Sequence, residues 1–126
     1  MKLFVLIATL FCFIACTKEE EPVRQFPVVI TGEVSNIFNS SATFSGDILS
    51  VSSGVVDYGF VWTLVGFPTL ANVNAIKQSF GAKAERGTFE FTTPNTLQPG
   101  KTYDMCAYVR SNQRIVYGKT HVFVSK

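Results

Sequence analysis

Two residues beyond the N-terminal segment have side chains suited to nucleophilic or metal chemistry, His121 and Cys106. A hydrolase needs a nucleophile with a base held beside it, or a metal-bound water. Neither residue has a second ligand at a spacing typical of a zinc site. Cys106 is a nucleophile or an intermolecular bridge in one interpretation, and a small, partly buried apolar residue in the commoner one. The sequence therefore predicts no metal site and no cofactor.

The carboxylates of the same region are scattered along the chain, and no spacing makes any two of them an acid–base pair for glycoside hydrolysis. They are Glu33, Asp47, Asp57, Glu85, Glu90 and Asp104. There is no glycine-rich phosphate loop. The net charge of +2 gives no electrostatic case for binding nucleic acid. We predict that the protein is not an enzyme and does not bind nucleic acid.

Residues 1–15 have the features of a signal peptide. Met1 and Lys2 form a short positive region, and an apolar run follows from Leu3 to Ile14. Twelve helical residues span about 18 Å, which is too short for a hydrocarbon core of about 30 Å. The run is therefore predicted to be the apolar region of a signal peptide and not a membrane span.

The end of this segment resembles the lipobox of bacterial lipoproteins, because a small Ala15 directly precedes Cys16. The usual leucine of that motif is replaced by Phe13. The resemblance implies that the Cys16 thiol receives a diacylglycerol, that cleavage occurs before it, and that the new amine is acylated. Several acyl chains together hold a protein stably on a bilayer. The open alternative is an ordinary cleavage site, with Cys16 a bystander.

Residues 16–26 are predicted to be the acylated cysteine and an acidic tether. Lys18, Glu19, Glu20 and Glu21 directly follow the cysteine region. This run is similar to the export signal of surface lipoproteins in Bacteroidetes-type bacteria. The resemblance implies an outer-membrane lipoprotein exposed at the cell surface, with a periplasm-facing orientation as the alternative.

Residues 27–126 have the composition of an all-β domain. After residue 15, Val, Ile and Thr number 30 and Leu only 4, and β-branched side chains suit a pleated sheet. Alternating patterns separated by turn residues, such as the turn expected at 36–40, predict a single antiparallel β-sandwich of about seven strands. The predicted strands are 27–34, 42–48, 55–64, 75–80, 88–92, 103–110 and 115–124.

One stretch before the predicted strand 103–110 resembles the fibronectin type III fold. Leu97, Pro99, Gly100 and Tyr103 match its Leu-x-Pro-Gly-x-x-Tyr pattern, and Trp62 matches the tryptophan of a Gly-Val-x-Trp strand. The resemblance implies an immunoglobulin-like sandwich in which the Tyr103 hydroxyl bonds back to upstream backbone. It also implies that Leu97 plugs the lower end of the core.

Two surfaces are candidates for binding. Phe67 and Leu70 lie in an apolar loop where such domains usually have polar residues, and Tyr108 and Arg110 share one face of a strand. We expect a lipid-anchored adhesion or binding module that recognises a protein or a glycan. The alternative is a structural accessory subunit of an envelope complex, for glycan uptake or secretion.

Overall fold

The computed structural model describes residues 26–126, which fold into strands and turns without a helix. The expected all-β sandwich is confirmed, with nine strands in place of about seven. The strands are β1 (Val28–Thr31), β2 (Ser35–Phe38), β3 (Ser41–Ser50), β4 (Asp57–Thr63), β5 (Ile76–Ser79), β6 (Gly87–Thr92), β7 (Thr102–Arg110), β8 (Ile115–Tyr117) and β9 (His121–Val124).

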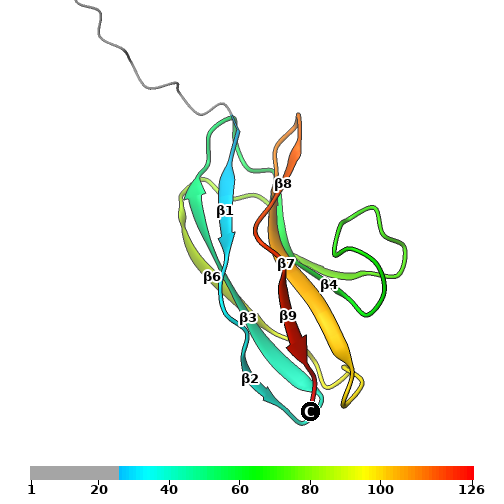
Figure 1. The fold of residues 1–126 in the computed structure, drawn as a ribbon. Coiled ribbons are helices and arrows are strands. Elements are labelled where there is room, and N and C mark those ends of the chain that lie inside the picture. Colours follow the sequence, from blue (N-terminus) through cyan, green and yellow to red (C-terminus); the bar gives the residue numbers. More distant parts are fainter. Residues whose placement is uncertain (1–25) are drawn as a thin grey trace, which may run out of the picture.

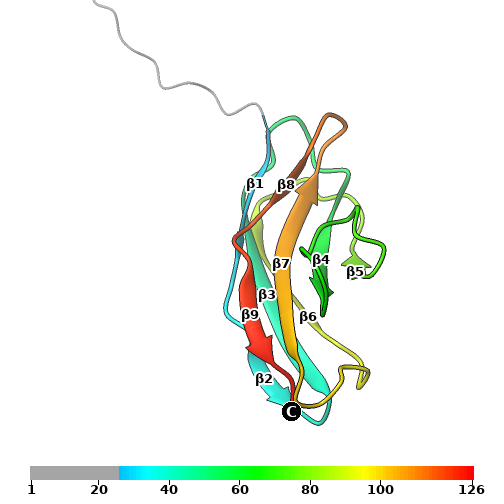
Figure 2. The same ribbon diagram turned by 45° about the vertical axis from the view of Figure 1, so that its right-hand side comes forward.

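The strands form two antiparallel sheets that pack face to face (Figure 1). In the first sheet, β1 and β2 pair along one side of β3, and β6 pairs along the other side. In the second sheet the order is β5-β4-β7, and both β8 and β9 pair with the free side of β7. Figure 2 shows β7 between β4 and the β8–β9 side of this sheet.

Aromatic side chains fill the space between the sheets. Phe44 on β3 lies at the centre, with ring centroids 5.7 Å from Phe60, 5.1 Å from Trp62 and 5.6 Å from Phe123. The alternation of β3 places Phe44 inward and its polar neighbours outward, as the period of two requires. Each buried ring removes a large apolar area from water, which supports a small domain whose one cysteine within residues 26–126, Cys106, is free.

A tyrosine ties the turn before β7 to the start of that strand. The hydroxyl oxygen of Tyr103 accepts a hydrogen bond of 2.8 Å from the backbone N–H of Gln98. This is the bond back to upstream backbone that the sequence resemblance implies. Leu97 beside it is buried in the core, and Gly100 has the positive φ of 77° that its turn requires.

The segment 36–40 differs from the expected turn, because it contains most of β2. Ser35 pairs with Thr43 and Phe38 with Ser41, so two residues of β2 lie opposite one residue of β3. This is a β-bulge. The positive φ of Asn36 allows the bulge. Because asparagine is typical of turns, the sequence pattern predicts a turn here in place of a strand.

The predicted last strand, 115–124, is divided into β8 and β9 at Gly118. Here Thr31 of the first sheet reaches the second, and its Oγ1 accepts a hydrogen bond of 3.0 Å from the N–H of Ala107. A Cβ at position 118 would lie 2.4 Å from this oxygen. The close approach requires glycine and interrupts the strand.

The predicted signal peptide and residues 16–25 of the predicted tether lie outside the described residues, so Cys16 and the Lys18–Glu21 run remain predictions. Phe26 is described, and the Arg114 guanidinium lies 4.5 Å from the centre of its ring. Within residues 26–126, no helix is long and apolar enough to cross a bilayer.

Candidate functional site

The loop between β4 and β5 projects from the outer face of the second sheet (Figure 1). It comprises residues 64–75. Its entry is fixed by Thr63, whose hydroxyl donates to the carbonyl of Val65 at 2.8 Å and accepts from the N–H of Val65 at 3.1 Å. Gly66 follows with a positive φ of 84°. The chain therefore turns sharply as soon as β4 ends.

Contacts with the sheet hold the base of this loop. The Cys106 thiol donates to the carbonyl of Pro68 at 3.2 Å, and the Tyr117 hydroxyl accepts from the N–H of Leu70 at 3.0 Å. The Leu70 side chain packs on a second, smaller core beneath the loop, in which Tyr108 is fully buried. The loop is thus part of the packed structure.

The outer part of the loop is closed by the side chain of Asn72. Its Nδ2 donates to the carbonyls of Val65 and Phe67, both at 2.9 Å. Its Oδ1 accepts from the N–H of Asn74 at 2.9 Å. One side chain therefore cross-links both arms of the loop, which limits the conformations it can adopt.

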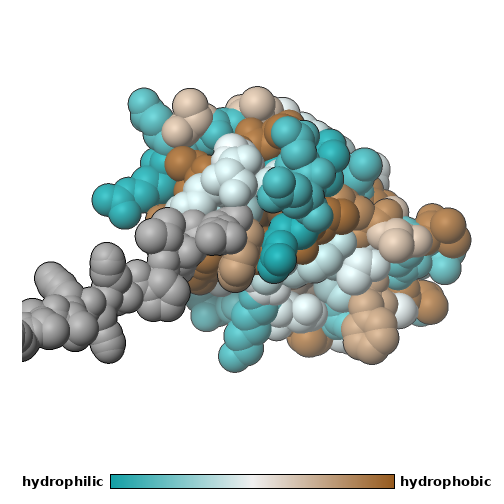
Figure 3. Space-filling model, turned by 90° about the horizontal axis from the view of Figure 1, so that it is seen from above, coloured by the Kyte–Doolittle hydropathy of each residue, from teal (hydrophilic) through white to brown (hydrophobic). Residues whose placement is uncertain are grey.

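Despite this ordering, the loop exposes large apolar side chains to water. Phe67 is 81% exposed and Val73 is 94% exposed. We define the apolar loop surface as Leu64, Val65, Phe67, Val73 and Ile76, all of which are exposed. Figure 3, which looks down on the molecule, shows hydrophobic atoms gathered on the side from which the loop projects.

A hollow of about 310 Å³ continues this surface toward the turn before β7. The loop contributes Leu64, Val65 and Asn74 to its lining, and Thr96 and Gln98 line the other side. A volume of this size lies at the lower end of the range for ligand pockets, about 300–1,000 Å³. The exposed side chains and the hollow together offer both a protruding and a recessed contact.

The structure separates the four residues predicted to bind. Phe67 lies on the apolar loop surface, and Leu70 is half-buried at its base. The prediction for Tyr108 is wrong, because the loop covers it completely. Arg110 is exposed at the end of β7, so it has no stacking partner in Tyr108. Sequence reasoning missed Val73 and Ile76, whose only signal was apolar character in a segment without clear alternation.

Tyr108 instead belongs to a buried polar network around Asp57. Its hydroxyl donates to Asp57 Oδ2 at 2.9 Å, while the Ser79 hydroxyl and the N–H of Gly81 donate to Oδ1. Burial raises the pKa of Asp57, but the hydrogen bonds together hold the pKa below its ordinary value. Burial and the neighbouring carboxylate raise the pKa of Tyr108. At neutral pH the Asp57 carboxylate is therefore charged and the Tyr108 phenol is protonated. Their hydrogen bonds, with that of Ser79, join β4, β5 and β7.

The structure gives Cys106 the environment of a packing residue. Burial raises the pKa of its thiol to about 12, so at neutral pH it stays protonated. It lies under the loop, with the Pro68 carbonyl as its hydrogen-bond partner. The thiol is therefore inaccessible to a substrate.

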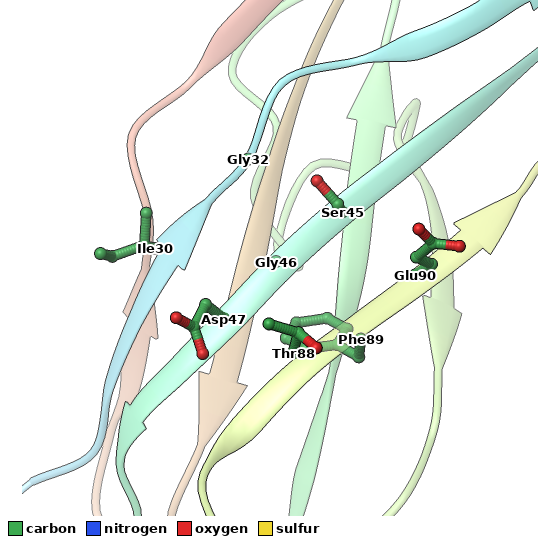
Figure 4. A pocket seen from close by; sticks show the side chains of 8 residues that line it. All are labelled: Ile30, Gly32, Ser45, Gly46, Asp47, Thr88, Phe89 and Glu90. Carbon is green, nitrogen blue, oxygen red and sulfur yellow. The ribbon is translucent and has the colours of Figure 1, made fainter.

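Two of the scattered carboxylates line the same shallow hollow on the outer face of the first sheet, but they do not form a pair. Asp47 lies opposite Thr88 and Glu90 lies opposite Ser45, and Thr88 stands between the two acids (Figure 4). The hollow is open to solvent, and neither a histidine nor a cysteine lines it. Within the part of the chain that the structure describes, no group of His, Cys, Asp or Glu is arranged to hold a metal ion.

Comparisons with known proteins identify similar folds only. A scan against protein-family models finds no match, and a search of curated proteins finds none either. Among solved structures, the sensor domain of the anti-sigma factor RsgI4 in Pseudobacteroides cellulosolvens is similar. A short form aligns with a TM-score of 0.61 at 17% identity, covering 82% of this chain and 97% of that chain. A solution structure gives 0.58 at 16% identity, covering 79% and 75%. This likeness shows the sandwich fold.

Proposed function

We propose that this chain is a non-catalytic binding module, anchored by lipid at Cys16 to the outer membrane and exposed at the cell surface. The apolar loop surface is its contact site for a protein partner. The anchor and the surface location are supported by the sequence patterns around Cys16 and Lys18–Glu21. The structural neighbours that are named sensor domains are compatible with a binding role.

The observation that carries the proposal is the combination of order and exposure in residues 64–75. Single exposed apolar residues are common on protein surfaces. Here Phe67, Val65 and Val73 are grouped, and the hydrogen bonds of Asn72 and the packing of Leu70 hold the segment that displays them. An exposed apolar group rimmed by polar residues is typical of an interaction site.

The chemistry of this surface favours a protein over a glycan. Four of its five residues are aliphatic, and Phe67 is the aromatic one. Aliphatic side chains offer no hydrogen bonds to sugar hydroxyls, but they match the apolar centre of a protein interface. Phe67 is suited to be the central anchor of such an interface, because its large aromatic ring is almost fully exposed.

Site-specific photo-crosslinking in the native cells tests this proposal. A photoreactive phenylalanine analogue replaces Phe67 in one variant of the full chain and Phe38 in the control. Phe38 is also an exposed phenylalanine, 63% exposed, but it lies on the first sheet. We expect a discrete protein adduct at position 67 that is absent at position 38. No adduct at position 67, or the same adduct at both positions, would contradict the proposal.

A second candidate function, an accessory subunit of an envelope complex, is favoured by Val122 and Val124. Both are exposed on β9, in the same sheet that carries the loop. A partner that covered these valines as well as the loop would bury the large apolar area of a permanent complex. Affinity purification from solubilised membranes distinguishes the two: a stoichiometric partner in every preparation supports the subunit, and a substoichiometric one supports the independent module.

A further inference from the structure

The outer face of the first sheet carries a second hollow, which shares no residue with the apolar loop surface. It has a volume of about 430 Å³, within the range of small-ligand pockets. It lies around β2, at the end of the sandwich opposite residue 26 (Figures 1 and 2). We call it the amide hollow and define it by Asn36, Asn39, Asn95, Thr43, Thr92 and Phe38.

The bulge in β2 creates this hollow. Because an extra residue is inserted between Ser35 and Phe38, Ile37 packs against the core while Asn36 and Phe38 both line the hollow. Ser35 pairs with Thr43, which lines the hollow, so Ser35 lies on the hollow's face of the sheet. Regular alternation from Ser35 would place residues 36 and 38 on the opposite face, toward the core. The bulge thus turns a phenylalanine away from the core and toward solvent, where it is 63% exposed.

Some polar groups of the hollow are paired and others are free. The hydroxyls of Thr43 and Thr92 hydrogen-bond to each other at 2.9 Å. The side-chain amides of Asn36, Asn39 and Asn95 are exposed and make no hydrogen bond within residues 26–126. Each such amide presents two donors and one acceptor oxygen to a ligand.

None of the residues that line the amide hollow is charged. A phosphate, carboxylate or ammonium ligand normally requires an opposite charge at its site. Amides and hydroxyls instead match a neutral ligand rich in hydroxyl groups, and one exposed aromatic ring matches the apolar face of a sugar ring. A protein partner fits less well, because Phe38 is the one large apolar side chain among these residues.

From these observations we infer that the amide hollow binds a neutral carbohydrate. Phe38 stacks on a sugar ring, and the three asparagine amides hydrogen-bond to its hydroxyls. This site is independent of the proposed function, since it lies on the other sheet and shares no residue with the apolar loop surface.

Affinity electrophoresis of the full chain, purified in detergent, tests the inference. Native gels contain one of four neutral polysaccharides, a glucan, a mannan, a xylan or a galactan, or an acidic polygalacturonate. We expect retardation by at least one neutral polysaccharide. Phe38→Ala should raise the dissociation constant at least tenfold, Asn95→Ala should raise it severalfold, and Phe38→Trp should preserve it. Phe67→Ala is the matched control and should change it less than twofold.

Unchanged thermal unfolding of Phe38→Ala would show that the loss comes from the site. The inference is overturned if no neutral polysaccharide retards the chain, or if only the acidic one does. It is also overturned if Phe38→Ala binds like the wild type, or if Phe67→Ala is the variant that loses binding. Loss of binding in Phe67→Ala would place the carbohydrate site on the apolar loop surface and not in the amide hollow.

Discussion

Asp57 is a buried carboxylate that accepts hydrogen bonds from Tyr108, Ser79 and the N–H of Gly81. Its pKa in the folded chain lies below the ordinary value of 3.8. The folded state therefore favours the charged form, and this contribution to stability is present above about pH 4. It is lost as the pH falls through the folded pKa.

We expect Asp57→Asn to lower the free energy of unfolding by about 2 kcal/mol at pH 7, since bonds to a charged acceptor are the stronger ones. The difference from wild type should narrow below pH 4. Urea unfolding from pH 2.5 to 7 measures both effects. Asp104→Asn is the control, because Asp104 makes no side-chain hydrogen bond within residues 26–126 and should change little. A difference in unfolding free energy between wild type and Asp57→Asn that did not vary with pH would contradict this account.

Tyr103 joins the turn before β7 to the strand through one hydrogen bond, from the N–H of Gln98. Tyr103→Phe keeps the ring and removes the acceptor, so we expect a loss of about 1 kcal/mol in unfolding free energy. Tyr58→Phe is the matched control, since the Tyr58 hydroxyl has no hydrogen-bond partner in the described part of the chain. Equal denaturation midpoints for wild type and Tyr103→Phe would show that the hydroxyl contributes nothing.

At the scale of the elements, the loop of residues 64–75 owes its order to Asn72 as well as to packing. Asn72→Ala removes two side-chain bonds to the carbonyls of Val65 and Phe67. Each bond contributes about 1 kcal/mol. We therefore expect amide hydrogen exchange in residues 65–73 to become about tenfold faster or more, while exchange in the strands stays unchanged. In the control, Asn74→Ala, exchange should stay near wild type. Acceleration throughout β4 and β7 would instead mean that Asn72 supports the whole sheet.

The central strands were predictable from the sequence, whereas the interrupted ones were not. In β3, Phe44 and its polar neighbours Thr43 and Ser45 alternate, and this pattern predicts a half-buried strand. β2 was hidden because Asn36 supplies both a turn signal and the positive φ of a bulge. The interruption between β8 and β9 at Gly118 depends on Thr31, which approaches from the other sheet. A local sequence pattern cannot predict such a contact between distant residues.

The candidate site was predictable only in part, for a related reason. The apolar stretch 64–70 points to Phe67, which the structure leaves exposed. Tyr108 alternates with inward-facing residues of β7, so it was expected to face solvent. A distant loop covers it, and the path of a loop across a sheet is set by tertiary packing with Leu70 and Val61. The amide hollow escaped notice because its residues come from β2, β3, β6 and the following turn.

For the whole molecule, attachment to the membrane is the proposal with the sharpest genetic test. Cys16→Ser should release the chain from the membrane fraction into the soluble fraction, and the mass added by acylation should disappear from the intact-mass spectrum. Cys12 lies within the predicted signal peptide, which is removed, so Cys12→Ser is the matched control and should stay membrane-bound with the full added mass. Protease treatment of intact cells then reports which side of the outer membrane the sandwich faces. An underivatised Cys16 in the native protein would refute the anchor.

The C-terminal residues are paired to the end of the sandwich that carries the amide hollow. The Lys126 carbonyl accepts a hydrogen bond of 2.8 Å from the N–H of Ser40, and the backbone of Ser125 bonds to Gly100 and Lys101. An affinity tag or fluorescent protein fused after Lys126 would therefore emerge beside Asn39 and crowd the hollow. Reporter fusions intended for sugar-binding assays are better inserted at the 111–114 hairpin, at the other end of the molecule.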